Sequence, residues 1–173
     1  VTIFSGRPGD HAVEVGVLRG DYSAEILKRN PATLYLVDPW LHQETGYSND
    51  CNNHSGENFQ AIYEGVVERF KENKSVKIIR DFSHSVAKLF ERASLDFVYL
   101  DARHDYASVL SDFCFWYPLV KPGGHICTHD FGGRGNHFYG VRQAVESFCA
   151  ITGNTIEFET QEPLWTTAAI KVK

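Results

Sequence analysis

Short apolar runs alternate along the chain with segments whose apolar residues recur at helical spacing. The runs are rich in β-branched and aromatic residues, which is typical of strands buried on both faces. They predict strands at residues 11–15, 33–37, 76–79, 96–100 and 125–128, with a closing pair at 154–158 and 165–172. The segments between them predict helices at residues 21–28, 59–71, 106–117 and 141–150, and a short one that ends at residue 90. Strands that alternate with helices form a mostly parallel sheet covered on both faces, so we expect an α/β protein.

The turn after the first predicted strand is the first candidate for a ligand-binding site. Gly16 and Gly20 stand four residues apart where a strand leads into a helix, which is where α/β sheets hold nucleotide-like ligands. Glycine permits a positive φ and a close approach of backbone to ligand. The spacing Gly-x-x-x-Gly differs from the Gly-x-Gly-x-x-Gly of dinucleotide sites, whose second glycine admits a pyrophosphate. The loop therefore favours an adenosine-type cofactor without a diphosphate, although plain packing explains two such glycines equally well.

Four of the predicted strands have an acidic residue at their carboxyl end or within two residues after it, namely Glu14, Asp38, Asp101 and Asp130. Ligands of open α/β sheets bind outside the carboxyl ends of the strands, so these acids are candidate site residues. Asp38 follows the second strand at roughly the position from which an acid accepts hydrogen bonds from ribose hydroxyls. Nicotinamide enzymes use the same position, so Asp38 does not distinguish between cofactors, and a solvated loop carboxylate is the alternative.

Composition and charge narrow the classes of function. A length of 173 residues predicts one domain, residues 1–173, with a substantial core. The net charge is −5 and Lys and Arg form no run, which argues against a nucleic-acid partner or an anionic membrane surface. We find no apolar segment of membrane-spanning length and no signal peptide. The four cysteines are widely separated, which is typical of reduced thiols and predicts a cytoplasmic protein.

Six stretches of the sequence then point to one family. They are Glu-Val-Gly-Val-Leu-Arg-Gly at 14–20, Val-Asp-Pro-Trp at 37–40, Asp-Phe-Val-Tyr-Leu-Asp-Ala-Arg-His-Asp-Tyr at 96–106, the run Asp-x-x-x-Trp-x-Pro-Leu-Val-Lys-Pro-Gly-Gly at 112–124, His-Asp at 129–130, and Gly-Val-Arg-Gln-Ala-Val-Glu-Ser-Phe at 140–148. Together they resemble the class I S-adenosylmethionine-dependent methyltransferases, nearest to the family that includes the macrolide-sugar O-methyltransferases. The resemblance implies a Rossmann-like, doubly wound, seven-stranded sheet. It also implies methyl transfer from S-adenosylmethionine to a small-molecule hydroxyl.

The resemblance further implies the residues that hold the cofactor. Gly16 and Gly20 would bracket its methionine part, with Glu14 close by. Asp38 would bind the ribose and Trp40 would lie near the adenine. Asp81 and Phe82 match the position that contacts the edge of the adenine, although Phe82 fits a core residue as well. The implied cofactor-binding set is Glu14, Gly16, Gly20, Ser23, Asp38, Trp40, Asp81, Phe82 and Asp101.

For the acceptor, the resemblance singles out Asp101 and Asp130. In metal-dependent relatives, acids at these two strand ends hold a divalent cation that lowers the pKa of the acceptor hydroxyl, and oxygen ligands suit Mg²⁺. The next position commonly supplies a further Asp or Asn ligand, but here it is Phe131, which cannot coordinate a metal. Water, a nearby side chain or the absence of any metal would each account for this departure.

Histidines supply the candidates for the acceptor of the hydroxyl's proton. His104 follows Asp101 by three residues, and an imidazole titrates near neutrality, as a general base should. The alternative for His104 is packing at a helix N-terminus that Asp105 caps, while His129 is expected to be structural. The expected catalytic set is Asp101, His104 and Asp130.

Two polar loops, residues 41–57 and 132–140, are expected to select the acceptor, with Arg134 as a candidate anchor for an anionic group. His137, in the second loop, is a further candidate for the proton acceptor. Lids shared between the subunits of a homodimer are a further expectation. Three other functions compete with this interpretation: a nicotinamide-dependent oxidoreductase, a non-catalytic cofactor-binding relative, and a metallohydrolase that uses Asp101, His104 and Asp130. The glycine spacing counts against the oxidoreductase. A metallohydrolase leaves the glycine loop unexplained.

Overall fold

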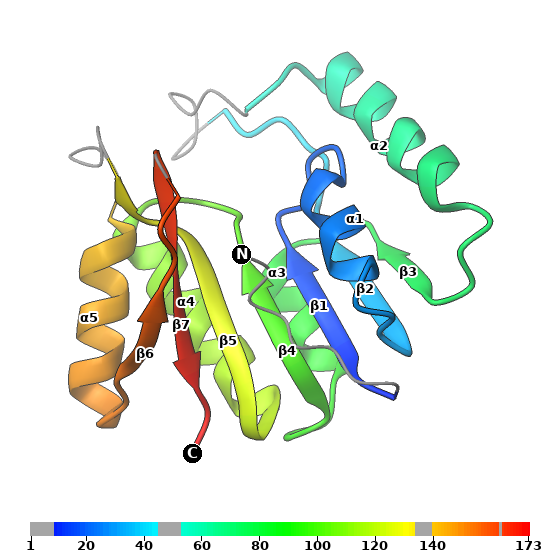
Figure 1. Ribbon diagram of the computed structural model, residues 1–173. Coiled ribbons are helices and arrows are strands. Elements are labelled where there is room, and N and C mark those ends of the chain that lie inside the picture. Colours follow the sequence, from blue (N-terminus) through cyan, green and yellow to red (C-terminus); the bar gives the residue numbers. More distant parts are fainter. Residues whose placement is uncertain (1–8, 45–52, 134–139, 163) are drawn as a thin grey trace.

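A computed structural model describes residues 9–44, 53–133, 140–162 and 164–173 (Figure 1). Its strands are β1 His11–Val15, β2 Thr33–Val37, β3 Val76–Ile79, β4 Leu95–Leu100, β5 Val120–Gly133, β6 Ile156–Glu159 and β7 Trp165–Lys171. Its α-helices are α1 Asp21–Leu27, α2 Gly56–Phe70, α3 Ser83–Val86, α4 Tyr106–Trp116 and α5 Val141–Thr152, with short 3₁₀-helices η1 Ala87–Leu89 and η2 Tyr117–Leu119. Strands and helices therefore alternate as the apolar pattern predicts.

The strands form one seven-stranded sheet in the order β3-β2-β1-β4-β5-β7-β6. β1 lies parallel to both β2 and β4, and the pairs β2–β3 and β4–β5 are parallel as well. β7 runs antiparallel to its two neighbours, β5 and β6. This arrangement confirms the predicted Rossmann-like, mostly parallel, doubly wound sheet, and the closing pair of strands forms its antiparallel edge.

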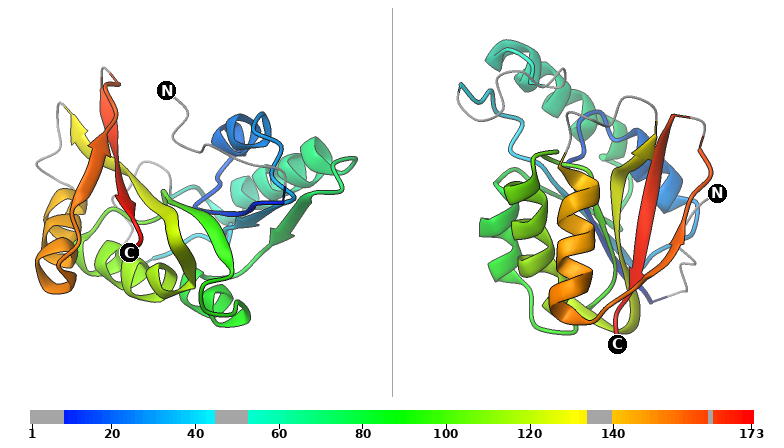
Figure 2. Two further views of the ribbon diagram at one scale, coloured as in Figure 1. Left: turned by 60° about the horizontal axis from the view of Figure 1, so that its bottom comes forward. Right: turned by 90° about the vertical axis from the view of Figure 1, so that its left-hand side faces the viewer.

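Helices cover the sheet on both faces and bury two separate apolar clusters. Side chains of α3, α4 and α5, such as Val86, Phe113 and Val145, pack on one face of the central strands. Side chains of α1 and α2, such as Ile26 and Val66, pack on the other face. Figure 2 shows α3, α4 and α5 together on one side of the sheet and α1 on the opposite side. Because successive strand residues point to opposite faces, a strand buried by both layers must be apolar throughout, which is the pattern found in the sequence.

The fifth strand is longer at both ends than the predicted 125–128. At its start, Val120 pairs with Leu95, and the register shifts before the next pair, so the segment that contains Gly123 and Gly124 is an irregular part of the strand. At its end, the register against β7 shifts between Thr128 and Gly132, and Asp130 there has a φ of +58°. This irregularity is typical of a β-bulge, which bends a strand and redirects a side chain. Asp130 therefore lies within β5 and not after it.

The helices also differ from the predicted bounds: α1 and α4 each end one residue earlier, and α5 ends two residues later. α2 begins at Gly56 instead of residue 59, because the Ser55 side chain caps its first turn by accepting a hydrogen bond from the Asn58 N–H at 3.4 Å. The short helix predicted to end at residue 90 divides into α3 and η1, and Phe90 itself is extended.

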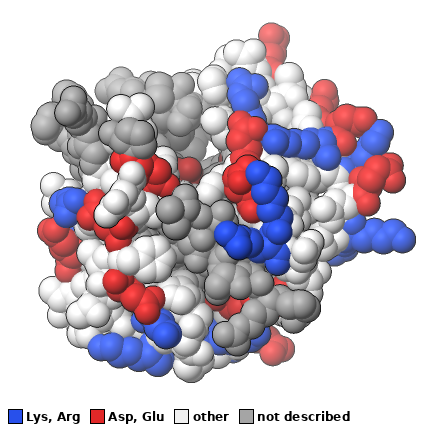
Figure 3. Space-filling view, in the orientation of Figure 1, with Lys and Arg blue, Asp and Glu red and all other residues white. Residues whose placement is uncertain are grey.

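The surface is consistent with the mixed charge of the sequence. On the face shown in Figure 3, basic and acidic side chains of the described residues are interspersed and form no continuous basic patch. Among the described residues, no helix has the length and apolar character that crossing a membrane requires.

Candidate active site

A cavity of about 420 Å³ opens at the carboxyl edge of the sheet. This volume lies in the range of pockets that bind small molecules and cofactors. Residues that follow four neighbouring strands line it: Gly16 after β1, Asp38 after β2, Phe82 and Ser83 after β3, and Asp101 after β4. Asp112 of α4 lines it as well. Of the residues expected to bind a cofactor, the structure thus brings Gly16, Asp38, Phe82 and Asp101 to one cavity.

Gly16 brings the β1–α1 turn into close contact with the end of β4. It has a φ of +85°, and a Cβ added to it would lie 2.0 Å from the backbone oxygen of Asp101. Its N–H donates to the Val37 carbonyl at 2.9 Å, while the Asp101 N–H donates to the Val15 carbonyl at 2.8 Å. Glycine is therefore required here both for conformation and for space.

Asp38 holds the glycine turn in place. Its Oδ2 accepts hydrogen bonds from the backbone N–H groups of Val17 at 2.9 Å and Leu18 at 3.0 Å, and its Oδ1 accepts one from Trp40 at 2.7 Å. Burial raises the pKa of Asp38, and these backbone donors oppose that effect. A carboxylate has about four acceptor positions, so Asp38 has capacity for a ribose hydroxyl in addition to this structural role.

Four of the expected cofactor residues lie behind the cavity wall and support it. The Glu14 carboxyl is buried and accepts a hydrogen bond from the buried Ser23 hydroxyl; burial raises its pKa well above the usual range, and the hydrogen bond opposes that rise. The indole of Trp40 is buried and donates to the Leu18 carbonyl at 2.8 Å. Gly20 begins α1 in the left-handed conformation and faces Phe70. The prediction that these four contact the cofactor stays untested.

The two residues expected at the adenine edge, Asp81 and Phe82, both follow β3 but lie in different surroundings. Phe82 lines the cavity and is 37% exposed, so the core alternative is wrong for it. Asp81 is exposed, and its Oδ1 accepts a hydrogen bond from the Phe82 N–H at 2.7 Å. Asp81 therefore orients Phe82, while Phe82 presents an aromatic ring to the cavity.

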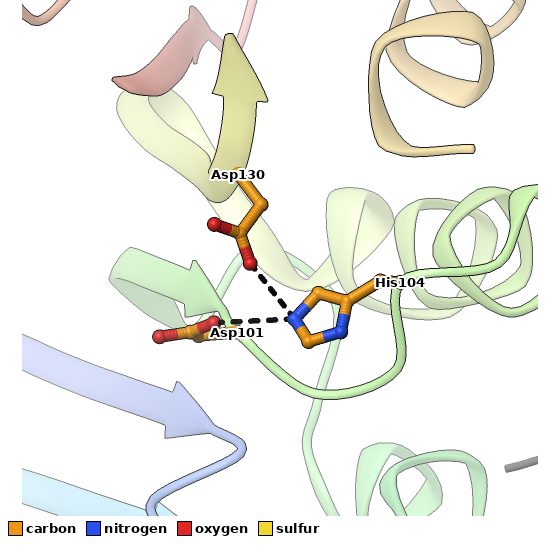
Figure 4. Close-up of side chains that lie close together, drawn as sticks. All are labelled: Asp101, His104 and Asp130. Atoms are coloured by element: carbon orange, nitrogen blue, oxygen red, sulfur yellow. Dashed lines mark ion pairs between the residues drawn. The ribbon is translucent and has the colours of Figure 1, made fainter. Parts of the chain in front are cut away.

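Three side chains converge beside the cavity at the end of β4 (Figure 4). The Nε2 atom of buried His104 lies 2.9 Å from Asp130 Oδ2 and 3.8 Å from Asp101 Oδ1. The β5 bulge directs Asp130 to this point, and the Asp105 side chain caps α4 by accepting from Ser108 N–H at 3.0 Å. Asp105 is thus the helix cap, as the alternative for His104 supposed, yet His104 itself points toward the two acids.

Asp130 is held between two histidines. His129 Nδ1 lies 3.2 Å from Asp130 Oδ1, on the other oxygen from the one that faces His104. Burial alone would raise the pKa of Asp130, but the hydrogen bonds from the two imidazoles outweigh it and hold that pKa well below the usual range. Burial likewise lowers the pKa of His129, and the hydrogen bond and charge of Asp130 overcome this and raise it. The cluster therefore keeps Asp130 ionised.

The cluster is suited to hold a divalent cation. One oxygen of Asp101, one oxygen of Asp130 and one nitrogen of His104 lie within 4.8 Å of one another. Phe131 lies in the core, where the guanidinium of Arg142 is 4.0 Å from its ring centroid, so it adds no ligand. Mg²⁺ prefers oxygen ligands only, whereas a set that includes an imidazole also suits Mn²⁺, Fe²⁺ or Zn²⁺.

A cavity residue that the motif interpretation left without a role is Asp112. The Ser83 hydroxyl donates to Asp112 Oδ1 at 2.5 Å, and the Trp116 indole N–H donates to Ser83 Oγ at 2.8 Å. Asp112 and Trp116 stand four residues apart on α4, so a helix places both on one face. The spacing of Asp112 and Trp116 was the only feature of the sequence that could have pointed to a role for Asp112. It gave no indication that Ser83 lies between the two side chains.

The predicted acceptor loops are only partly described. Arg134, His137 and residues 45–52 lie outside the described residues. Leu41 and Gln43, from the described part of the first loop, line the cavity.

The fold and the site define a nucleoside-type cofactor site at the carboxyl edge of a Rossmann-like sheet, and comparison with known proteins agrees. The profile of a family described as "Methyltransferase domain" matches residues 13–131. No curated protein sequence matches the chain. The chain belongs to this methyltransferase family, and it is an S-adenosylmethionine-dependent methyltransferase.

Three solved structures with the same fold carry methyltransferase names of different kinds. The N-methyltransferase NodS of Bradyrhizobium japonicum WM9 aligns with a TM-score of 0.64 at 11% identity, over 94% of this chain and 85% of its own. Geranyl diphosphate methyltransferase, solved with S-adenosylmethionine, aligns at 0.66 and 12%, over 95% and 79%. An O-methyltransferase family protein of Burkholderia thailandensis aligns at 0.64 and 13%, over 94% and 50%. At such identities the likeness establishes the fold alone, so the acceptor must be inferred from the site.

Proposed function

We propose that this methyltransferase transfers the methyl group to a hydroxyl of a small molecule that binds beside Asp101, His104 and Asp130. The observation that carries the proposal is that Asp101 belongs both to the cavity and to this cluster. An acceptor placed at the cluster therefore meets the cofactor at the end of β4. Neutral hydroxyls are weak nucleophiles that gain most from a group that removes their proton, and the cluster supplies such groups.

The residues around the cavity hold the cofactor in the orientation that the reaction needs. The Gly16 turn accommodates its methionine part, Asp38 accepts from the ribose hydroxyls, and Phe82 contacts the base. The sulfonium already activates the methyl group, so the protein's task is to align the acceptor oxygen in line with the carbon–sulfur bond. The oxygen forms a bond to the methyl carbon, the carbon–sulfur bond breaks, and S-adenosylhomocysteine leaves as a neutral thioether.

The cluster receives the proton that the hydroxyl loses. Asp101 accepts a hydrogen bond from the hydroxyl and takes its proton as the bond to the methyl carbon forms. The Nε2–H of His104 donates to Asp130 and faces Asp101 (Figure 4), so His104 orients the two carboxylates. When a divalent cation is bound, its ligands would be Asp101, His104 and Asp130, and it would lower the pKa of the hydroxyl.

Paired acceptors test the choice of atom. We would measure S-adenosylhomocysteine formation with phenol against aniline and with cyclohexanol against cyclohexylamine, without metal and with Mg²⁺ or Mn²⁺. We expect turnover of the hydroxyl member of a pair, and a loss of about 100-fold or more in the His104→Gln variant, whose carboxylates lose the imidazole that orients them. Its matched control is His125→Gln, since His125 lies in β5 outside the cavity and the cluster, with its Nε2 2.6 Å from Glu157 Oε2.

Binding separates a catalytic loss from a structural one. Isothermal titration with S-adenosylhomocysteine should give the same affinity for the wild type and for His104→Gln, because the His104 imidazole makes no contact with the cofactor in this proposal. Methyl transfer to the amine member alone, or full turnover in His104→Gln, would contradict the proposal. Loss of cofactor binding in Asp38→Ala but not in His104→Gln would support the division of the site into two parts.

A further inference from the structure

The order of the lining residues along the sheet orients the cofactor within the cavity. Asp101 follows β4 and belongs to the cluster, Asp38 follows β2, and Phe82 and Ser83 follow β3. Neighbouring strands lie about 4.8 Å apart, so the three spacings from β4 to β3 cover about 14 Å. The transferred methyl group must lie beside the cluster. The base of the cofactor must then lie at the far end, beside Phe82 and Ser83.

Asp112 of α4 lines the cavity and is fixed at that far end. The Trp116 indole N–H donates to Ser83 Oγ at 2.8 Å, and an indole nitrogen can only donate. The single hydroxyl proton of Ser83 therefore goes to Asp112 Oδ1, 2.5 Å away. Trp116 is fully buried, so it anchors Ser83 rigidly. Ser83 and Trp116 thus hold Asp112 as a hydrogen-bond acceptor with oxygen capacity left for a ligand.

Three aromatic rings lie at the same end of the cavity. The ring centroids of Phe82 and His84 are 6.0 Å apart, and those of His84 and Phe115 are 6.4 Å apart. All three line the cavity, and Phe82 and Phe115 are 37% and 39% exposed. Exposed rings at a cavity suit the face of a purine, because flat aromatic surfaces stack. A purine that packs on these rings turns its polar edge toward other cavity groups, of which Asp112 is an anionic one.

We propose that Asp112 is the specificity-determining residue for the base of the cofactor, and that it accepts a hydrogen bond from the 6-amino group of adenine. An ionised carboxylate can only accept, so it favours the amino group of adenine and disfavours the 6-oxo group of hypoxanthine. This role rests on the chain binding S-adenosylmethionine, and it adds a residue from α4 to those that the sequence motifs indicate.

The test compares two ligands that differ at this one group. Isothermal titration at pH 7.5 would use S-adenosylhomocysteine and S-inosylhomocysteine. We expect the wild type to bind S-adenosylhomocysteine at least 10-fold more tightly, because the 6-oxo group, which can only accept, would face an Asp112 carboxylate that can only accept as well. In Asp112→Asn the ratio should fall below about 3-fold, since an amide can donate to the 6-oxo group. The Ser111→Ala variant, which alters a neighbouring cavity residue of α4, should keep the wild-type ratio.

A structural role for Asp112 would change both affinities equally. An unchanged ratio in Asp112→Asn, or equal affinities in the wild type, would therefore overturn the proposal. Failure of the wild type to bind either ligand is a different result, because it would contradict cofactor binding itself.

Wild-type protein alone also tests the proposal if Asp112→Asn does not fold. Burial raises the pKa of Asp112 to about 6, opposed by the hydrogen bond from Ser83, while Asp105 raises it further and Arg103 lowers it. A protonated carboxyl can donate to a 6-oxo group. The preference for S-adenosylhomocysteine should therefore shrink at least 3-fold between pH 7.5 and pH 5. A preference that increases as the pH falls over that range would overturn the proposal.

Discussion

At the scale of single residues, the tightest point of the site is Gly16, and its role is to let two strand ends meet. A Cβ there would overlap the Asp101 backbone oxygen at 2.0 Å, and the φ of +85° would strain any other residue. The chain contains a natural comparison in Gly123, whose φ is +84° but whose Cβ would meet nothing within 4 Å. Both positions therefore require a positive φ, but only at Gly16 would a Cβ overlap neighbouring atoms.

We expect Gly16→Ala to lower the free energy of unfolding by about 2–5 kcal/mol. About 1–2 kcal/mol comes from the left-handed conformation, and the rest comes from overlap that the backbone must shift to relieve. Gly123→Ala should cost only the conformational part, about 1–2 kcal/mol. Urea unfolding of both variants measures the difference, and equal losses would show that space beside Asp101 is not limiting.

Asp38 shows how one residue can serve the fold and the site at once. Its three backbone donors fix the turn from which Gly16 and Leu18 reach the cavity. A carboxylate placed to bind a ribose is thereby also a brace for the turn beside it. Replacement of Asp38 therefore affects cofactor binding both directly and through the turn.

At the scale of elements, the second glycine of the Gly-x-x-x-Gly motif belongs to a contact between helices. Gly20 precedes α1 with a φ of +75°, and a Cβ on it would lie 2.7 Å from Cε2 of Phe70, the last residue of α2. Arg69 Nη1 joins the same elements by donating to the Arg19 carbonyl at 2.9 Å and to Asp21 Oδ1 at 2.7 Å. The motif thus combines one glycine that the cavity requires with one that helix packing requires.

A double-mutant cycle tests this division. Gly20→Ala should cost about 2–4 kcal/mol, in part from φ and in part from overlap with the Phe70 ring. Phe70→Leu removes the ring, so the second part should vanish in the double variant. We expect the double variant to be about 1 kcal/mol or more better than the sum of the single losses. Additive losses, measured by urea unfolding, would mean that the two side chains do not compete for space.

At the scale of the whole molecule, the sequence predicted the sheet well because its central strands are buried on both faces. A strand such as Thr33–Val37 must be apolar at successive positions, and few other structures require that pattern. The cavity edge also follows from the sequence, since parallel strands place Asp38 and Asp101 at the same end. The identity of the cofactor required the resemblance to a family, because an acid after the second strand serves several cofactors.

The parts that the sequence did not predict depend on contacts between distant segments. The β5 bulge that directs Asp130 to His104 is a shift in the pairing of β5 with β7. No residue type in β5 predicts that shift. The link from Ser83 to Asp112 joins residues 29 apart, and only the packing of α3 on α4 brings them together. The place of Phe131 in the core likewise became clear only from the fold.

The ionisation of Asp112 should also change the free energy of unfolding of the whole molecule. The pKa of its carboxyl is about 6 in the folded chain against an ordinary 3.8. An acid whose pKa is raised by folding binds its proton more tightly in the folded state, so its contribution is greatest below about pH 4 and is lost as the pH rises to about 6. A shift of this size corresponds to about 1–3 kcal/mol. Other carboxyls change stability over the same range, so the difference between variants carries the information.

Urea unfolding at pH 4, 5, 6 and 7 should therefore separate three proteins. Asp112→Asn cannot titrate at this position, so relative to the wild type it should gain about 1–3 kcal/mol between pH 4 and pH 7. Ser83→Ala removes a hydrogen bond that lowers the pKa of Asp112, so its stability should fall more steeply with pH than that of the wild type. Parallel pH profiles for all three proteins would mean that Asp112 keeps an ordinary pKa. If instead the stability of Asp112→Asn falls less steeply with pH than that of the wild type, and the stability of Ser83→Ala falls more steeply, then the ionisation of Asp112 contributes to the stability of the entire fold.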